Sequence, residues 1–263
     1  MLKSIDSAYL IDRSRYFRRS YLELVYNSHE ALIPSVFSII DIITYLYHQA
    51  LILHNSQYDL FISKGHAASV IYPYLIDLGL FNTSEIDFAA EGSKFGIYAN
   101  TDIPQIPMPS GSLGHGLGVA AGYTYAKKIH SPIFVFLGDG EVFEGSVYEA
   151  ALFVSLKSLS NIYLIIDCNN RTIMGDLDQT YPGYHPSLLF NSLGYRSFNV
   201  DGHDFSSMHK VFTEAITAST DRPTVIYANT VKGKGFPLLE SSHLWHNRMP
   251  SKDQLDNAIK ELS

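Results

Sequence analysis

The sequence predicts an α/β protein in which a parallel sheet is flanked by helices, and three segments carry this prediction. Residues 133–137 and 162–167 are two short apolar runs rich in β-forming residues. Such runs are typical of strands buried on both faces of a parallel sheet. Between them, residues 146–159 have helical spacing and good helix formers. The three segments together form one βαβ unit.

The other elements follow similar patterns along the chain. The most apolar stretch, 36–53, is interrupted by Asp41, His48 and Gln49, so it fits a buried amphipathic helix better than a membrane span. Residues 82–109 are rich in Gly, Pro, Asn and Asp, which predicts a loop over the site where substrate choice is made. Further strands are predicted at 58–62, 195–200 and 224–229, and further helices at 206–218 and 253–262.

Composition and charge indicate a compact soluble protein. The chain has 263 residues, so residues 1–263 can form a single domain with a sizeable core. Its formal net charge is −7 and its basic residues form no long run, which argues against nucleic acid as a partner. The only cysteine, Cys168, excludes an internal disulfide, and the first residues carry no secretory signal pattern. A cytoplasmic protein with no membrane span is therefore expected.

Polar residues follow both central strands at the point where each strand ends. Gly138, Asp139 and Gly140 come directly after the first strand, and Asn169 and Asn170 follow the second. In parallel sheets the carboxyl ends of the strands share one edge, so these groups are expected on the same rim. Hard oxygen ligands beside glycines that let phosphate approach the backbone suit Mg²⁺ (or Ca²⁺) bound together with a diphosphate. Gly-Asp-Gly alone is also typical of a plain turn, and the matched Asn pair favours the metal site.

The two motifs, about thirty residues apart, resemble the thiamine diphosphate motif, and further segments are similar to the transketolase family. These segments are 61–67 (Phe-Ile-Ser-Lys-Gly-His-Ala), the glycine-rich turn 110–118, and residues 230–236 and 244–246. The glycine-rich turn starts a helix, where glycines permit close approach and the helix N-terminus attracts an anionic diphosphate. The resemblance covers about 28–250 and implies the thiamine-diphosphate-binding fold of the N-terminal, diphosphate-binding half.

The resemblance also implies roles for individual residues. The metal, Mg²⁺ or Ca²⁺, would be bound by side-chain oxygens of Asp139 and Asn169 and by the backbone carbonyl of Arg171. Thiamine diphosphate would contact His66, Gly114, His115, Gly138, Asp139, Gly140, Glu144, Asn169 and His246. Hydrogen bonding or proton transfer with donor and acceptor hydroxyls would fall to His29, His66 and His246.

Three positions depart from the family pattern. Ser28 stands where glycine is usual before His29, and His115 stands where the family often has glutamine. Tyr98 falls near the place where sugar-phosphate transketolases usually have the histidine of a Gly-His-Pro segment, and that tripeptide is missing here. The third departure concerns the choice of substrate rather than the cofactor.

In transketolases, a glutamate from a second, pyrimidine-binding domain activates the aminopyrimidine ring of the cofactor. This sequence ends at Ser263, after the first domain, and Glu141 and Glu144 follow the diphosphate-binding turn, at the opposite end of the cofactor. The resemblance therefore implies a split transketolase, in which a separate pyrimidine-domain chain completes the site and two copies of each chain form a heterotetramer. The reaction would transfer a two-carbon ketol unit from a ketose or 2-oxo donor to an aldehyde.

Three other interpretations stay open at this point. The same fold and cofactor could serve a decarboxylase or ligase acting on a 2-oxo acid. The chain could also be a non-catalytic subunit that stabilises an active partner, although intact Asp139, Asn169 and His66 argue against this. A nucleotide-binding Rossmann domain is weaker, because the glycine-rich turn does not directly follow the first predicted strand.

Overall fold

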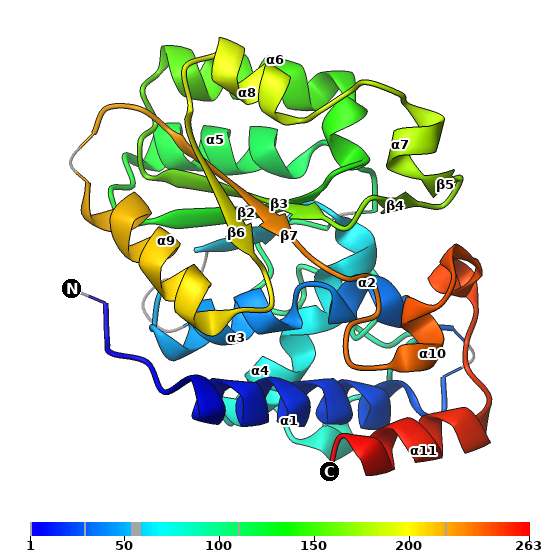
Figure 1. Cartoon of the computed structure of the whole chain (residues 1–263). Helices are drawn as coiled ribbons and strands as arrows, with labels where there is room; N and C mark the ends of the chain where they lie inside the picture. The colour runs from blue at the N-terminus through cyan, green and yellow to red at the C-terminus, as the bar shows by residue number, and fades with distance from the viewer. Residues whose placement is uncertain (1, 29, 54–58, 110, 219) are drawn as a thin grey trace.

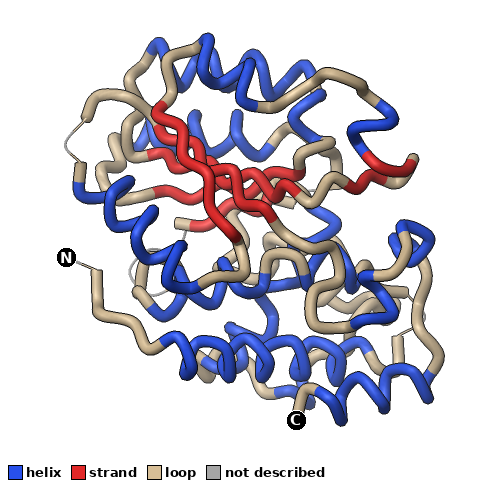
Figure 2. The backbone as a smooth tube through the Cα atoms, in the orientation of Figure 1, coloured by secondary structure: helices blue, strands red, loops and turns tan. Residues whose placement is uncertain are grey.

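The computed structural model describes residues 2–28, 30–53, 59–109, 111–218 and 220–263. Five parallel strands form a central sheet in the order β1-β2-β3-β7-β6, drawn in red in Figure 2. Their bounds are β1 Leu60–Ile62, β2 Ile133–Gly138, β3 Ile162–Cys168, β6 Arg196–Asp201 and β7 Thr224–Asn229. A short antiparallel hairpin of β4 (Arg171–Thr172) and β5 (Gly175–Asp176) follows β3. The predicted parallel α/β architecture is confirmed.

Helices cover both faces of the sheet (Figure 1). One face is covered by α5 (Gly116–Lys127), α6 (Gly145–Leu156) and α8 (Ser187–Ser192), and the other by α9 (Phe205–Thr217) together with α3 (Ile40–His48). The chain passes through β1, β2 and β3 in one direction and then runs back from the edge strand β6 to β7. Because crossovers between parallel strands are right-handed, this reversal places α9 on the opposite face.

The central strands are buried on both faces, as their unbroken apolar runs predict. Every residue in 133–137 of β2 is fully buried. Phe134 and Phe136 belong to the core that contains α3 and α9, whereas Val135 and Leu137 belong to the core beneath α5 and α6. Successive side chains of a strand point to opposite faces of the sheet, so one apolar run contributes to two hydrophobic cores.

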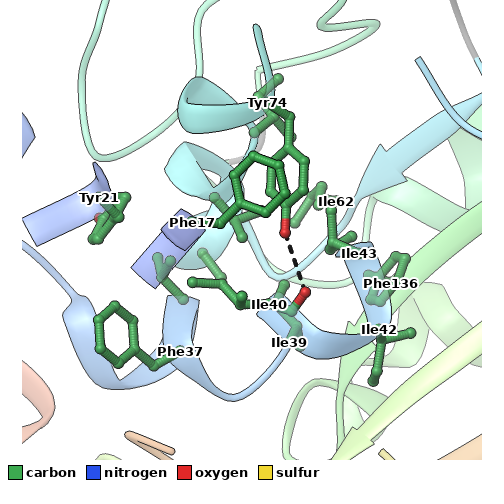
Figure 3. Close-up of a cluster of buried hydrophobic side chains, with 14 of the residues drawn as sticks. Phe17, Tyr21, Phe37, Ile39, Ile40, Ile42, Ile43, Ile62, Tyr74 and Phe136 are labelled. Atoms are coloured by element: carbon green, nitrogen blue, oxygen red, sulfur yellow. Dashed lines mark hydrogen bonds between the residues drawn. The ribbon is translucent and has the colours of Figure 1, made fainter. Parts of the chain in front are cut away.

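The layer on the α3 side begins with α1 (Ser7–Val25), a helix that the sequence analysis did not predict. Asp6 caps it by accepting hydrogen bonds from two backbone N–H groups of the first turn. On its buried face, Phe17 stacks on Tyr74 of α4 (Tyr72–Asp77), with ring centroids 3.9 Å apart. Figure 3 shows this cluster, in which the Tyr74 hydroxyl also donates a hydrogen bond to a backbone carbonyl at the start of α3, at 3.1 Å. These aromatic contacts fix α1 beneath α3 and α4.

The prediction of one helix over 36–53 was wrong, because this stretch contains two helices. The first, α2 (Ile33–Phe37), ends before Ser38, and α3 starts two residues later. The Ser38 hydroxyl donates a hydrogen bond to Asp167 Oδ2 at 2.7 Å. Asp167 is 129 residues away in the sequence, so this hydroxyl makes a long-range contact, while the backbone of Ser38 keeps helical angles (φ −61°, ψ −30°).

The remaining predicted elements are present with small shifts in their bounds. Residues 82–109 form a loop that includes the short 3₁₀ turn η2 (Thr83–Glu85), and the last predicted helix is α11 (Lys252–Glu261). The predicted strand 58–62 corresponds to β1, and its first residue lies outside the described residues. The other short elements are η1 (Gly65–Ile71), η3 (Glu141–Phe143), α7 (Leu177–Thr180), α10 (Pro237–Glu240) and η4 (His243–Asn247). Within the described ranges, every helix is too short or too polar to cross a membrane.

A buried ionic network ties α1 to α3. Arg18 donates to both carboxylate oxygens of Asp41, at 2.7 and 2.9 Å, and His203 Nδ1 lies 2.7 Å from Asp41 Oδ2. Burial alone would raise the pKa of Asp41, but the charge of Arg18 and the hydrogen bonds outweigh burial, so this pKa lies well below its usual range. Asp41 is therefore ionised in the folded protein at neutral pH.

We expect Asp41→Asn to lower the free energy of unfolding at pH 7 by about 3–5 kcal/mol, because the buried Arg18 loses its counter-charge. The folded-state pKa of Asp41 lies below its unfolded value of about 4, so its contribution is present above that pH and is lost as the pH falls. Urea unfolding should therefore show the largest difference between wild type and variant at pH 7 and a smaller one in acid.

Asp77→Asn is the matched control for this prediction. The ion pair between Asp77 and Arg13 is partly exposed, with side-chain exposures of 24% and 25%. We expect a loss below about 1 kcal/mol for this variant. Similar losses of unfolding free energy in the two variants would mean that the buried Arg18–Asp41 pair stabilises the protein no more than the partly exposed Arg13–Asp77 pair.

Candidate active site

A cleft of about 690 Å³ lies at the carboxyl ends of the strands. Its walls come from the segments that follow β1, β2, β3 and β7, and from η4. In Figure 1 the β4–β5 hairpin, α7 and α10 gather at this end of the sheet. The site residues predicted from the sequence that line the cleft are His66, Gly138, Asp139, Gly140, Glu144, Asn169, Arg171 and His246.

Asp139 lies just past the end of β2 and is only 5% exposed. Its Oδ1 accepts a hydrogen bond from the backbone N–H of Gly140 at 2.8 Å, and its Oδ2 accepts one from that of Asn170 at 2.7 Å. Burial and, after it, the nearby charge of Asp167 raise the pKa of Asp139 to about 6. A bound cation would offset both effects, so this carboxylate has the electrostatics of a metal ligand.

Two neutral oxygens lie on the same side of the cleft. Asn169 Nδ2 donates to Asp167 at 2.9 Å, and Asn169 Oδ1 accepts from the backbone N–H of Arg171 at 3.0 Å. The carbonyl oxygen of Arg171 accepts from Lys232 Nζ at 3.2 Å, so it already faces a cation. Carboxylate, amide and carbonyl oxygens are the ligands that Mg²⁺ prefers. Among the described residues there is no cluster of three His, Cys, Asp or Glu side chains suited to a metal, so the set fits a metal that also takes phosphate or water ligands.

Lys232 is a further candidate for binding a ligand. No role was predicted for it from the sequence, although it precedes a Gly-Lys-Gly segment that resembles the family. It is 6% exposed, and its ammonium contacts two neutral acceptors, the carbonyl of Arg171 and His246 Nδ1 at 2.7 Å. In the part of the chain that the structure describes, no Asp or Glu forms an ion pair with it. Burial and the charge of Lys64 lower the pKa of Lys232 to about 8. A buried ammonium without a counter-charge suits a phosphate ligand.

Two histidines, carried by η1 and η4, line the same cleft. The ring centroids of His66 and His246 are 5.7 Å apart. Burial, and then the charges of Lys64 and Lys232, hold the pKa of His66 well below its usual value. Burial and the charge of Lys232 lower the pKa of His246 to about 4. Both imidazoles are therefore neutral at pH 7, and each can donate one hydrogen bond and accept another.

Glu141 is a structural link rather than a free acid in the cleft. It is 3% exposed, and its Oε1 accepts from Ser63 Oγ at 2.5 Å and from the backbone N–H of Gly114 at 2.7 Å. Its Oε2 accepts from the backbone N–H of Gly138 at 3.1 Å. One side chain thus joins the segments after β1 and β2 to the glycine-rich turn.

The glycine-rich turn before α5 contributes to two hollows. Gly111 and Leu113 line the cleft, whereas Gly114 and His115 line a second hollow of about 390 Å³ between α5 and α6. Gly114 has φ +82°, and a Cβ atom there would lie 2.5 Å from Ser146 Oγ, so this position requires glycine. Cofactor contacts of Gly114 and His115 stay a prediction.

Three further positions complete the description of the site. His29 lies outside the described residues. Tyr98, the departure from the family pattern, lines the cleft and is about half exposed. Ser35, which the sequence analysis did not single out, is buried at the cleft wall, and its hydroxyl has no hydrogen-bond partner among the described residues. A buried hydroxyl of this kind is available to a ligand.

A parallel sheet with polar side chains and a buried lysine gathered at its carboxyl edge is typical of α/β domains that bind a ligand at this edge. The chain belongs to the transketolase family, because residues 27–262 match the family described as "Transketolase, thiamine diphosphate binding domain". The predicted family and the predicted thiamine-diphosphate-binding fold are confirmed.

Some known proteins of the family match this chain over about a third of their own length, and another matches it over most of its length. Human transketolase is 33% identical over 223 residues, which cover 80% of this chain and 33% of that protein. One of the subunits of an apulose-4-phosphate transketolase, from Phocaeicola vulgatus, is 28% identical over 256 residues, which cover 94% of this chain and 91% of that protein. The crystal structure of transketolase from Campylobacter jejuni superposes with a TM-score of 0.88 at 25% identity, over 98% of this chain and 43% of that one. The chain therefore spans about a third of several relatives, including mouse transketolase-like protein 2, and most of another.

Proposed function

We propose that this chain is the thiamine diphosphate-binding subunit of a two-chain transketolase, which transfers a two-carbon ketol unit from a ketose or 2-oxo donor to an aldehyde. The observation that carries the proposal is the cleft, which joins a buried carboxylate, a buried ammonium and two neutral imidazoles at the carboxyl edge of the sheet. Similarity over 91% of a protein whose name describes one subunit of a transketolase supports the two-chain arrangement. In this arrangement residues 1–263 act as one domain.

The cofactor would bind through the oxygen and nitrogen groups described above. The metal, Mg²⁺ or Ca²⁺, would take Asp139, Asn169 and the carbonyl oxygen of Arg171 as ligands. Lys232 would neutralise part of the diphosphate charge, and Gly138 would leave room for the phosphate to approach the backbone. When bound, thiamine diphosphate supplies the electron sink for breaking the carbon–carbon bond of the donor.

The histidines would handle the protons of the substrates. His66 and His246 line the cleft as neutral imidazoles, so His66 can donate to a substrate oxygen at one ring nitrogen and accept a proton at the other, whereas His246 can donate to the substrate. Lys232 donates to His246 Nδ1, which leaves the hydrogen of that ring on Nε2. We assign the same kind of role to His29. Tyr98, at the cleft wall, would contact the substrate and influence its choice.

A separate pyrimidine-domain chain would cover an apolar surface on α6. This surface consists of Tyr148, Leu152 and Leu156, which are spaced four residues apart on one face of the helix and are each at least 38% exposed. Grouped exposed apolar side chains are typical of a protein interface. The partner would supply the activating glutamate, and two copies of each chain would form a heterotetramer.

The test is to mix the purified chain with a candidate pyrimidine-domain chain from the same source, with Mg²⁺ and thiamine diphosphate. We expect a melting-temperature rise and turnover of hydroxypyruvate or a sugar phosphate only in the mixture. Turnover by the chain alone would overturn the two-chain arrangement. Decarboxylation of pyruvate would favour the 2-oxo acid enzyme, and cofactor binding without turnover of any donor would favour a non-catalytic subunit.

Two surface variants make the partner test sharper. Leu152→Glu places a charge in the centre of the apolar surface, so we expect it to prevent association in gel filtration while the melting temperature of the free chain stays unchanged. Leu80→Glu is the matched control, because Leu80 is 47% exposed against 46% for Leu152 but follows α4, away from the cleft. Association that survives Leu152→Glu would place the interface elsewhere.

A further inference from the structure

Lys64 and Asp167 form an ion pair directly behind the predicted metal ligands. They are 1% and 0% exposed. Lys64 Nζ donates to Asp167 Oδ2, and the same oxygen accepts from Ser38 Oγ at 2.7 Å. The other oxygen, Oδ1, accepts from Thr230 Oγ1. Asp167 does not line the cleft, so it acts on the site by its charge and through the residues to which it is hydrogen-bonded.

Asn169 contacts Asp167 and lines the cleft, as Lys64 does. Asn169 Nδ2 donates to Asp167 Oδ2 at 2.9 Å, and Asn169 Oδ1 accepts from the backbone N–H of Arg171 at 3.0 Å. A carboxylate paired with an ammonium has no hydrogen to donate, so it can only accept from the amide. The amide must therefore present its NH₂ group to Asp167 and its oxygen to the opposite side.

The orientation of this amide decides whether Asn169 can bind a cation. A metal such as Mg²⁺ takes the amide oxygen and cannot take the NH₂ group. The two ends of an Asn side chain have nearly the same shape, so packing alone does not distinguish them. Hydrogen-bond partners of fixed polarity distinguish them, and Asn169 has two such partners, Asp167 and the backbone N–H of Arg171.

We infer that Asp167, held by Lys64, is a positioning residue that fixes the amide of Asn169 so that its oxygen rather than its nitrogen faces the metal. The inference deepens the proposed function and rests on the metal site proposed there. Ser38, in the turn between α2 and α3, is one of the donors that hold Asp167 in place. A positioning partner of a ligand typically changes metal affinity by about 10–100-fold.

The experiment is a double-mutant cycle with Asp167→Asn and Asn169→Asp, made in the chain assembled with its partner. The readout is the affinity for Mn²⁺ in the presence of thiamine diphosphate, measured by electron paramagnetic resonance. In Asp167→Asn the new amide can donate or accept, so only the backbone N–H of Arg171 still fixes the polarity of the Asn169 amide, and we expect about 10–100-fold weaker Mn²⁺ binding. In the Asn169→Asp background either oxygen of residue 169 can bind the metal, and Asp167→Asn also replaces a carboxylate that would repel the new one, so adding it should not weaken binding.

The cycle separates positioning from the two other effects of removing Asp167. Loss of a negative charge near the metal would weaken binding by the same factor in both backgrounds, and that result would overturn the inference. The buried Lys64 loses its counter-charge in both backgrounds too, and metal-free melting temperatures would report this shared cost. Unchanged Mn²⁺ affinity in Asp167→Asn would also overturn it. A wild-type protein that binds no Mn²⁺ would overturn the proposed metal site itself, and the inference with it.

Discussion

Replacing Asp139 with alanine will abolish the stabilisation of the protein by Mg²⁺ and thiamine diphosphate. In the wild type, ligand at 100 times its dissociation constant adds about 2.7 kcal/mol, or about 5–10 °C in melting temperature for a chain of this size. Asp139 is the carboxylate among the proposed ligands, and without it an amide and a carbonyl oxygen remain. We expect no measurable rise with the alanine variant, and a loss of turnover of at least about a hundredfold in the assembled enzyme.

The same variant should not be less stable than the wild type when metal and cofactor are absent. The folded-state pKa of Asp139 is raised to about 6 by burial and by Asp167, above its unfolded value of about 4. The fold therefore disfavours the ionised form, and stability falls as the pH rises through this window, by roughly 2–3 kcal/mol. Alanine removes this cost and also two hydrogen bonds to backbone N–H groups, which offset each other in part.

Thermal melts of wild type and Asp139→Ala, with and without Mg²⁺ and thiamine diphosphate, measure both effects in one series. Asp102→Ala is the control, because Asp102 is an exposed residue of the 82–109 loop and does not line the cleft. A large drop in the metal-free melting temperature of Asp139→Ala would show that the carboxylate supports the fold rather than a ligand.

The central sheet could be predicted because its strands are buried on both faces, so a plain apolar run such as 133–137 is enough to identify them. By contrast, α1 was missed. Charged residues are scattered along it, and only its aromatic contacts with α4 reveal which face is buried. The contact of Ser38 with Asp167 is likewise one that no local pattern in 36–53 reveals.

The residues of the candidate site likewise include some that the sequence predicts and some that it does not. Asp139 and Asn169 follow from a local rule, because each stands at the end of an apolar strand and strand ends share one rim. The contact between Lys232 and His246 joins η4 to the segment after β7. Ser35, whose hydroxyl has no hydrogen-bond partner within the described ranges, comes from α2. Both depend on how distant segments meet. The requirement for glycine at Gly114 likewise comes from Ser146 on the neighbouring helix rather than from the turn itself.

Replacing His66 with alanine will lower turnover by about 10²–10⁴-fold while the affinity for thiamine diphosphate changes only a few-fold. The reason is that different residues of the cleft would bind the cofactor and the substrate. The proposed metal ligands and Lys232 hold the charged end of the cofactor, and this set is intact in the variant. His66 stands beside His246 as a neutral imidazole, 5.7 Å away between ring centroids, where it can exchange hydrogen bonds with a substrate hydroxyl.

The measurement is the turnover number and the cofactor dissociation constant of the assembled enzyme, for His66→Ala, His66→Gln and the control His130→Ala. His130 is exposed and does not line the cleft, so its replacement should change neither quantity. Glutamine keeps a hydrogen-bond donor and acceptor but cannot take up a proton, so partial recovery in His66→Gln would assign hydrogen bonding to His66, and no recovery would assign proton transfer. Equal losses in turnover and cofactor affinity with alanine would instead make His66 a cofactor ligand, because a residue that acts on the substrate alone leaves cofactor binding unchanged.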